Sequence, residues 1–418
     1  MITISNLRIE DKKELSYLLC DIQDDVKNKK TEVWFSVSSQ YKEYLCTELA
    51  DAFLLGLLPI AVKHNQDITV DAAVSPRLLY NLRTGIEPMY QKIFKKSGCT
   101  KITVRETKDI NFNGKGVATG CSLGVDSLSA IYSHLEKDIV DEFKLTHLTL
   151  FNSGQLGDYD LEASEQNFLN NVEEIKPFAE SLNLNILAIN SNFNSLYKEG
   201  GMILLHTFVT RTMAFAMSVQ KLIKYYIYAS SHPVDKIKFG YMDSSYHEAA
   251  FVSLLTTESF LPVLADQYMT RVDKTAYIRT KPYVSKYLKV CWAEQTAYEV
   301  WQNTTFLEGK TKTNCGWCDK CLRTLLTLEV LNNGNLDDYK EQFELKKYYQ
   351  HRDAYIKKIF AERKKNSFYQ EMVDLIIEKE YPIDKSVLRK FRRQNKKETQ
   401  KSKFRSLLRR IINKILRR

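Results

Sequence analysis

The stretch GVATGCSLGVDS, residues 116–127, decides the fold of this chain. Its first half is a short run of small and β-branched residues, which is typical of a buried strand. Its second half, from Ser122 to Ser127, is a polar turn, after which a helical pattern runs to Leu135. A strand that passes through a turn of small residues directly into a helix predicts a ligand-binding loop at the carboxyl end of that strand.

The alternation of strand and helix continues beyond this loop. Strand patterns lie at 147–152, 184–190 and 225–230, and helical patterns lie between them at 163–181 and 204–222. Helices of this length between strands imply right-handed crossovers and parallel pairing. The sequence therefore predicts an α/β fold, a doubly wound and mostly parallel sheet, in a domain spanning residues 113–335.

The flanking regions have patterns of their own. Residues 1–112 contain strand patterns around 32–37, 68–74 and 101–106 and helical patterns at 41–58 and 76–94, which predict an N-terminal α/β accessory domain. Residues 336–384 predict a helical C-terminal extension. Residues 385–418 form a basic tail in which apolar residues recur at helical spacing from Phe404 to Leu416.

The charge of the chain is concentrated in this tail. The 418 residues carry a net charge of +10, and the tail alone holds fifteen Lys and Arg against the single acid Glu398. A basic amphipathic helix is compatible with an anionic membrane surface, with RNA phosphates or with packing on the protein itself. No apolar run approaches the roughly 18 residues of a spanning helix, and the N-terminus lacks a signal-peptide pattern. We expect a cytoplasmic protein, peripheral at the inner membrane surface if the tail binds lipid.

The loop itself has the composition of a phosphate-binding site. The start of a helix directs backbone N–H groups and the positive end of its dipole toward an anion. Ser122 and Ser127 add hydroxyl donors, Gly124 allows a tight turn, and Asp126 can hold a magnesium-bound water or position the loop. The Gly-Lys-Ser/Thr of a Walker loop is absent. A polar strand-to-helix turn without a ligand is the alternative.

Three cysteines follow in the pattern Cys315-x-x-Cys318-x-x-Cys321. Thiolates at this spacing converge on one metal ion, and Cys291 is the best candidate for a fourth ligand. Four protein ligands predict a structural zinc site. An iron–sulfur cluster is the rival, although the spacing of the bacterial ferredoxin motif is absent.

The Ser-x-Gly-x-Asp-Ser loop, followed by the four cysteines and Arg323, resembles the PP-loop ATP pyrophosphatases and, among them, the 7-cyano-7-deazaguanine synthase family. The resemblance covers residues 116–323. It implies an adenine nucleotide alpha hydrolase-like fold that binds ATP with Mg²⁺, and a catalytic role for Asp126 and Lys274, the latter as a second phosphate contact. Leu123 stands where the family has its first glycine, and residues 1–112 have no counterpart in it.

Several further residues could have either a functional or a purely structural role. Arg211 is a candidate phosphate contact on a helix, and His232, which follows a strand, is either an acid–base group or a turn residue. Cys121 is either a sulfur carrier or a small buried residue. We expect Asp243, His247 and Glu248 to be solvated rather than metal ligands.

The function that the sequence predicts is an ATP-dependent adenylating enzyme, which activates an oxygen of a small-molecule substrate and releases pyrophosphate. The adenylated oxygen then leaves in an amidation or a related substitution. Two alternatives stay open: an ATP-binding regulatory module without turnover, and a tRNA-modifying enzyme that thiolates or amidates a base. The acceptor and the oligomeric state, including a homo-oligomer, are also open.

Overall fold

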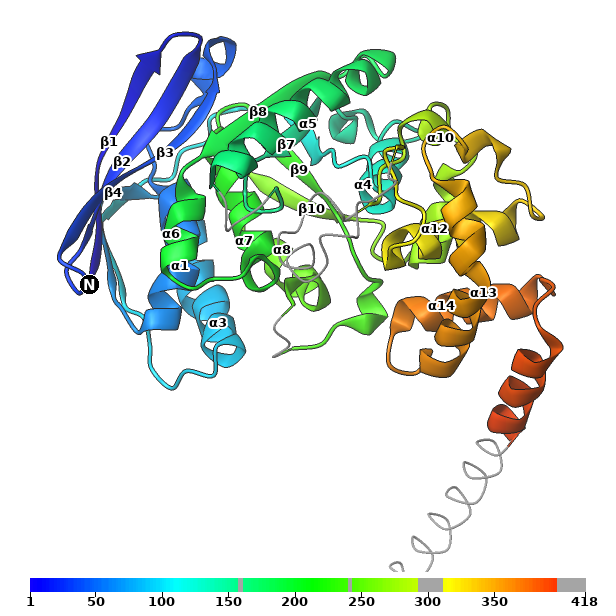
Figure 1. The fold of residues 1–418 in the computed structure, drawn as a ribbon. Coiled ribbons are helices and arrows are strands. Elements are labelled where there is room, and N and C mark those ends of the chain that lie inside the picture. Colours follow the sequence, from blue (N-terminus) through cyan, green and yellow to red (C-terminus); the bar gives the residue numbers. More distant parts are fainter. Residues whose placement is uncertain (157–160, 240–242, 292–310, 397–418) are drawn as a thin grey trace, which may run out of the picture.

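The computed structural model describes residues 1–156, 161–239, 243–291 and 311–396. Its strands form one sheet in the order β10-β9-β6-β7-β8-β3-β2-β1-β4-β5 (Figure 1). The strands are β1 (Ile2–Lys12), β2 (Leu15–Asp24), β3 (Lys29–Ser38), β4 (Ile68–Val74), β5 (Ile102–Thr107), β6 (Gly116–Gly120), β7 (His147–Phe151), β8 (Asn185–Ser191), β9 (Ile223–Ala229) and β10 (Leu261–Ala265). The α-helices are α1 (Asp51–His64), α2 (Pro76–Asn81), α3 (Glu87–Ile93), α4 (Val125–Ser133), α5 (Leu161–Ser181), α6 (Phe193–Glu199), α7 (Leu204–Met217), α8 (Glu248–Val252), α9 (Arg271–Ile278), α10 (Val284–Tyr287), α12 (Asp319–Leu331), α13 (Leu345–Glu362) and α14 (Ser367–Glu378).

Five neighbouring strands, β10, β9, β6, β7 and β8, run parallel to one another. This parallel part begins at β6, adds β7 and β8 on one side, and then returns to add β9 and β10 on the other. The order of strands therefore reverses at β6, and the crevice beside its carboxyl end is where open α/β sheets bind ligands. The α/β class and the mostly parallel sheet of this region are confirmed.

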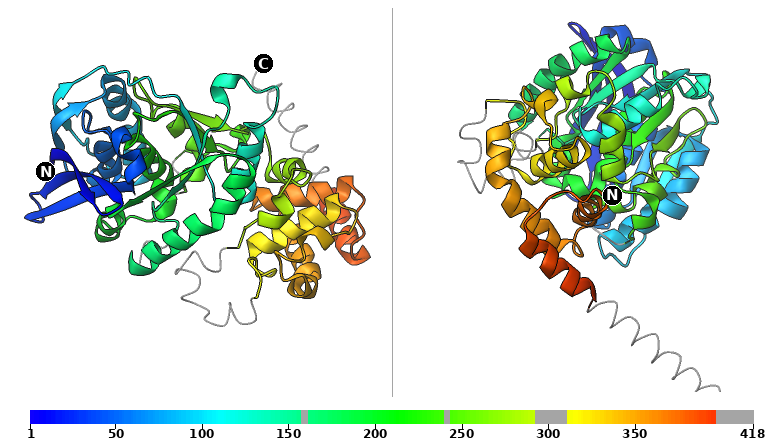
Figure 2. Two further views of the ribbon diagram at one scale, coloured as in Figure 1. Left: turned by 90° about the horizontal axis from the view of Figure 1, so that it is seen from above. Right: turned by 90° about the vertical axis from the view of Figure 1, so that its right-hand side faces the viewer.

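Helices cover both faces of the parallel strands (Figures 1 and 2). Along β9, Tyr226 and Tyr228 belong to one hydrophobic cluster, whereas Tyr225 and Ile227 belong to a second. Because successive strand residues point to opposite faces, each cluster occupies one face of the sheet. The first cluster includes α1 and α7, and the second includes α4, α12 and α13.

The N-terminal region is part of the same sheet. Strands β1, β2 and β3 form an antiparallel meander, and β3 pairs antiparallel with β8 through Phe35 and Ser36. Helix α1 packs against α7, so residues 1–112 share a hydrophobic core with the following region. The predicted boundary at residue 112 thus separates two halves of one sheet.

Several predicted elements differ from the structure. Strands β1, β2 and β10 were not predicted, and the helix expected at 41–58 begins only at Asp51, after a 3₁₀ turn at Ser39–Tyr44. The extension is helical as expected: α13 and α14 pack with α12 at the end of the molecule opposite β1 and β2 (Figure 1). Most of the basic tail, residues 397–418, lies outside the described residues. Within the described ranges, no helix combines the length and apolar character needed to cross a membrane.

Candidate functional site

The Ser122 loop joins the end of β6 to the start of α4. Leu123 adopts a left-handed backbone, with φ of 56°, and its side chain is buried in the second hydrophobic cluster. Its carbonyl accepts a hydrogen bond of 2.9 Å from the Lys289 N–H, which ties the loop to the segment that leads to Cys291. This turn allows the chain to pass from strand to helix within four residues, with Gly124 at the N-cap of α4.

The predicted loop residues lie next to one another. The Ser122 and Ser127 hydroxyl oxygens are 3.2 Å apart, and the Gly124 N–H donates to Ser122 Oγ at 3.3 Å. Ser127 Oγ donates to the Gly124 carbonyl at 3.1 Å. A β-carbon at Gly124 would lie 3.2 Å from Ser122 Oγ, so the loop is compact at this glycine. Hydroxyl groups and the first turn of α4 therefore converge on one point.

The loop opens into a cavity of about 310 Å³ at the carboxyl ends of the parallel strands. The walls come from β6, β7, β9 and α12, and include Cys121, Ser127, Thr149, Tyr226, Ser231 and Lys320. The cavity lies where the strand order reverses at β6. Both its position and its polar lining are those expected of a ligand site in this class of sheet.

Asp126 is held between two cations from α9. The Arg271 guanidinium donates to its Oδ2, and Lys274 Nζ lies 3.6 Å from its Oδ1. Lys274 is buried and also donates to Ser230 Oγ at 2.9 Å. Burial alone would raise the pKa of Asp126, but Arg271 and Lys274 outweigh it and lower the pKa, so the carboxyl is ionised. The structure thus brings together Asp126 and Lys274, the two residues predicted to be catalytic.

A second cavity, of about 670 Å³, adjoins the first. Asp126 and Lys320 belong to the walls of both. Burial, together with the nearby Arg271 and Arg323, lowers the pKa of Lys320 to about 7. The second cavity extends from there to Phe368 at the start of α14. The extension therefore contributes a wall beside the predicted site.

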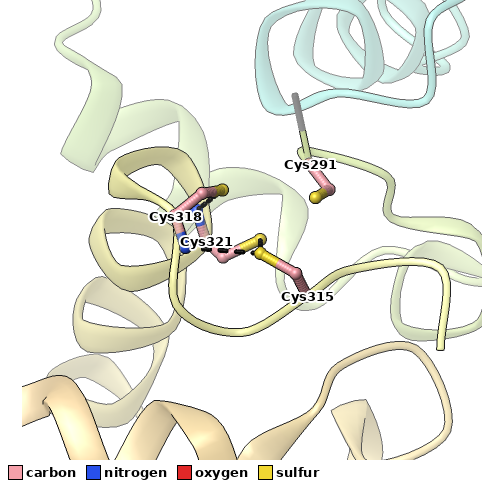
Figure 3. Close-up of side chains that lie close together, drawn as sticks. All are labelled: Cys291, Cys315, Cys318 and Cys321. Atoms are coloured by element: carbon pink, nitrogen blue, oxygen red, sulfur yellow. Dashed lines mark hydrogen bonds between the residues drawn. The ribbon is translucent and has the colours of Figure 1, made fainter. Parts of the chain in front are cut away.

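The four predicted cysteine ligands form one cluster (Figure 3). Their sulfurs all lie within 4.8 Å of one another, and those of Cys315 and Cys321 are 3.8 Å apart. A tetrahedral zinc ion with bonds of about 2.3 Å places its sulfurs about 3.8 Å apart. The four cysteines of an iron–sulfur cluster are divided among two or four iron atoms, so their sulfurs are spread more widely than around a single ion. The cluster can hold one metal ion such as zinc, with all four positions filled by protein.

Backbone N–H groups support this cluster. The Cys318 N–H donates to the sulfur of Cys315 at 3.3 Å, and the Cys321 N–H donates to the sulfur of Cys318 at 3.4 Å. Gly316 has φ of +82°, and a β-carbon there would lie only 2.4 Å from the Glu344 carbonyl oxygen. Such N–H donors stabilise thiolates, so the turn is prepared for a metal ion. Helix α12 begins inside the turn and places Lys320 and Arg323 beside the cavities.

Arg211 and Cys121 have surroundings that are less suited to their predicted roles. Arg211 is fully buried, donates to Thr207 Oγ1 at 2.7 Å and stacks 3.8 Å from the centre of the Tyr197 ring. It does not line the loop cavity, although it donates to the carbonyl of Ser153, which does. Burial raises the pKa of Cys121 to about 12, so its thiol is protonated, as expected of a small buried residue.

The surroundings of His232, His247 and Glu248 also bear on their predicted roles. His232 lines the second cavity, where its ring stacks between Tyr246 and Phe368 at 4.5 and 4.8 Å. Burial lowers the pKa of His232 to about 4, so the ring is neutral. The expectation that His247 and Glu248 are solvated is wrong. Both are buried, because α8 packs against α7 and Glu248 accepts hydrogen bonds from the N–H groups of Ser231 and His232.

The sequence did not indicate three contributors to the site. Arg271 lies three residues before Lys274, and no motif in the sequence marks it. Lys320 lies inside the cysteine motif without being a metal ligand, and Phe368 lies in the extension. Each reaches the site through packing of α9, α12 and α14, which are far apart in the chain.

Comparison of the chain with protein-family models, with curated proteins and with solved structures gives no match.

Proposed function

We propose that this chain is an ATP-dependent adenylating enzyme of the PP-loop type. One observation carries the proposal: the Ser122–Ser127 loop opens, where the strand order reverses, into a cavity beside an aspartate flanked by Arg271 and Lys274. The likeness of the loop and cysteine motifs to 7-cyano-7-deazaguanine synthase, drawn from the sequence alone, supports the same function.

The phosphates of ATP would lie against the loop. The first turn of α4 offers N–H groups that have no partner within the helix, and Ser122 and Ser127 offer hydroxyl donors. Lys274 and Lys320 supply positive charge from two other helices. Charge that develops on the phosphates in the transition state would be stabilised by these fixed donors.

Asp126 suits the ion that accompanies ATP. Its Oδ1 has no hydrogen-bond partner among the described residues, although Lys274 is near. A carboxylate oxygen of this kind is an appropriate ligand for Mg²⁺ or for one of its waters. Arg271, which donates to Oδ2, would then be available to turn toward the phosphates.

The reaction that fits these residues is a displacement at the α-phosphorus. A substrate oxygen forms a bond to that phosphorus, the bond to the bridging oxygen breaks, and pyrophosphate leaves with the electron pair. The residues position the two reactants and neutralise charge, and they form no covalent bond with either. The metal at the four cysteines would hold α12 in place, because it has no open coordination position for water or substrate.

Pyrophosphate release tests the proposal. The zinc-loaded full chain is incubated with ATP, Mg²⁺, ammonia and a panel of carboxylates and nucleosides. We expect release that depends on one class of acceptor, and a loss of at least about 100-fold in Asp126→Asn. Asp141→Asn is the control, because the Asp141 side chain is 90% exposed and forms an ion pair with nearby Lys144. ATP binding without release for any acceptor would favour the regulatory module instead.

A further inference from the structure

The second cavity has features of a binding site in its own right. Its volume of about 670 Å³ is well within the range of small-molecule sites. It shares six wall residues with the loop cavity, so a molecule inside it would reach the phosphate site without leaving the protein. These residues are Asp126, Gln155, Phe208, Tyr228, Ser231 and Lys320. Its walls come from α7, α9, α12, α13 and α14 and from the segments 231–232 and 243–246.

One end of this cavity carries a buried cation that forms no salt bridge with the described carboxylates. Arg323 is 7% exposed, and its Nε has no hydrogen-bond partner. Asp126, Asp319 and Glu371 attract its charge only from beyond salt-bridge distance. Its guanidinium lies 4.2 Å from the centre of the Phe368 ring. A cation–π contact contributes about 1–2 kcal/mol, less than the several kcal/mol that burial of an unpaired charge costs. The balance favours an anion at this end.

The other end is apolar and open. Leu205, at the start of α7, is 49% exposed, and Leu204 and Phe208 lie beside it on the cavity wall. When an apolar group covers solvent-exposed leucine side chains in a cavity, apolar surface is removed from water, which favours binding. The wall at α12 carries Lys320, Arg323 and one carboxylate, Asp319, which accepts a hydrogen bond from Tyr369 and lies 3.5 Å from Lys358. The wall at α7 is apolar.

The extension helps to form this cavity and is tied to the phosphate site. Phe368 of α14 packs on both His232 and Arg323. Glu371, one turn further on, accepts a hydrogen bond of 3.1 Å from the Arg271 N–H at the start of α9. These contacts place α14 between the helix that carries Arg271 and the helix that carries Arg323. Residues outside the stretch that resembles the PP-loop family thus shape one side of the cavity.

We propose that the second cavity is the acceptor-substrate site and that it takes an anion with an apolar body. The anionic group lies near Arg323 and Lys320, facing the phosphate site, and the apolar body lies along Phe208 and Leu205. Helix α14 then helps to determine which acceptor is used. The role of the bound molecule as an acceptor rests on the proposed function. The preference for an anion with an apolar body follows from the cavity alone.

Two matched probes test the preference. The fluorescent anion 2-naphthoate and its neutral amide, 2-naphthamide, share one apolar body and differ in charge. We expect the zinc-loaded full chain to bind the anion at least tenfold more tightly than the amide. Leu205→Asp, at an exposed position that tolerates substitution, should weaken binding of the anion at least tenfold. Val140→Asp should leave it unchanged, because Val140 is 64% exposed in the connection from α4 to β7.

Arg323→Gln tests the charged end and should abolish the preference for the anion, with zinc content and circular dichroism reporting whether the variant folds. Equal binding of the two probes, no binding of either, or no effect of Leu205→Asp would overturn the proposal. Pyrophosphate release is measured separately. If naphthoate is preferred as expected but no acceptor yields pyrophosphate, the enzyme proposal fails and the anion site stands. If pyrophosphate is released but Leu205→Asp leaves naphthoate binding intact, only the cavity proposal fails.

Discussion

The backbone at Leu123 combines a strained conformation with a buried side chain. A φ of 56° is unusual for leucine and costs about 1–3 kcal/mol relative to glycine. The side chain is 2% exposed in the core shared with α4 and α12. Burial of a leucine contributes about 2–5 kcal/mol, which is enough to offset the strain. The residue therefore keeps the turn that glycine would provide and adds packing beneath the loop.

This balance predicts an inverted order of stability for two substitutions. Leu123→Ala loses the packing and keeps the strained backbone, whereas Leu123→Gly loses the packing and relieves the strain. We expect both to lower the free energy of unfolding, with the glycine variant about 1 kcal/mol more stable than the alanine variant. Urea unfolding of the wild type and the two Leu123 variants measures these free energies. Val125→Ala and Val125→Gly, in the adjacent helix, should show the usual order, with alanine more stable.

Glu248 makes stability depend on pH. Burial raises its pKa to about 8, although the N–H groups of Ser231 and His232 act in the opposite direction. The unfolded chain releases this proton near pH 4.3, so between about pH 4 and pH 8 the folded state binds more protons than the unfolded state. Stability should fall as the pH rises through that interval, by at most about 1.4 kcal/mol per unit.

Glu248→Gln should remove this slope, because an amide oxygen can accept the same two hydrogen bonds without titrating. The variant is expected to gain stability over the wild type at pH 8 and to gain little at pH 4.5. Thermal unfolding at both pH values measures the difference. Glu173→Gln, at a side chain that is 69% exposed on α5, is the control and should follow the wild type. A parallel pH profile for Glu248→Gln and wild type would contradict the assignment.

Among the elements, the turn before α12 depends on one glycine. Gly316 requires a left-handed backbone, and a β-carbon there would lie 2.4 Å from the Glu344 carbonyl oxygen. Gly334 has a similar φ of +93° but nothing within 4 Å of its added β-carbon. Gly334→Ala should therefore lower the free energy of unfolding only by the backbone strain, about 1 kcal/mol. Gly316→Ala should lower it by clearly more, because the added β-carbon also clashes. Unfolding free energies and zinc content of the two variants test this, and equal losses would contradict it.

The cysteine cluster and α12 should behave as one unit if the cluster holds zinc. Cys315→Ser or Cys291→Ser is expected to reduce bound zinc from about one ion per chain to a small fraction, because a thiolate is lost from a closed site. Helix α12 would then lose its anchor, and the fluorescence of Trp317 in the turn should change. Elemental analysis and fluorescence measure both effects. Cys99→Ser is the control, since Cys99 is exposed and far from the cluster in sequence. Visible absorption bands in the purified protein would instead indicate an iron–sulfur cluster.

The parallel strands were predictable from the sequence, and the edges of the sheet were not. Strands β6, β7, β8 and β9 are short apolar runs between helices, a pattern with few alternatives. In β1, charged residues are frequent because much of the strand is half-exposed, which hides the alternation. Strand β10 contains Pro262 and has only five residues, features that sequence patterns assign to loops but that an edge strand tolerates.

The candidate site was predictable where its residues are close in sequence. The Ser122 loop and Cys315–Cys321 are local motifs, and Cys291 was correctly assigned to the cluster because an ion needs a fourth ligand. Arg271 beside Asp126 and Phe368 beside Arg323 arise from helix packing over long sequence separations. No periodicity in a single sequence encodes such contacts, so they required the structure.

At the scale of the whole molecule, the ten strands join two regions that the sequence suggested were separate domains. Phe35 on β3 is fully buried and lies at the centre of an aromatic group. Its ring is 5.2 Å from Phe53 of α1, 5.2 Å from Phe193 of α6 and 5.1 Å from Phe215 of α7. Since Phe193 and Phe215 belong to the half that carries the loop, packing connects the N-terminal strands to the region of the site.

Phe35→Ala should therefore destabilise both halves, by about 3–5 kcal/mol, while the protein still unfolds in one transition. Hydrogen exchange is expected to quicken in β8 and α7 as much as in β2 and β3. Tyr17→Ala is the matched control, because the Tyr17 ring packs edge-on against Trp34 of the same N-terminal region. Tyr17→Ala should destabilise the protein less than Phe35→Ala. The increase in hydrogen exchange that it causes should be largest in β2 and β3. Two separate transitions, with faster exchange confined to residues 1–112, would mean that the N-terminal region folds as an independent domain that merely shares an edge with the sheet.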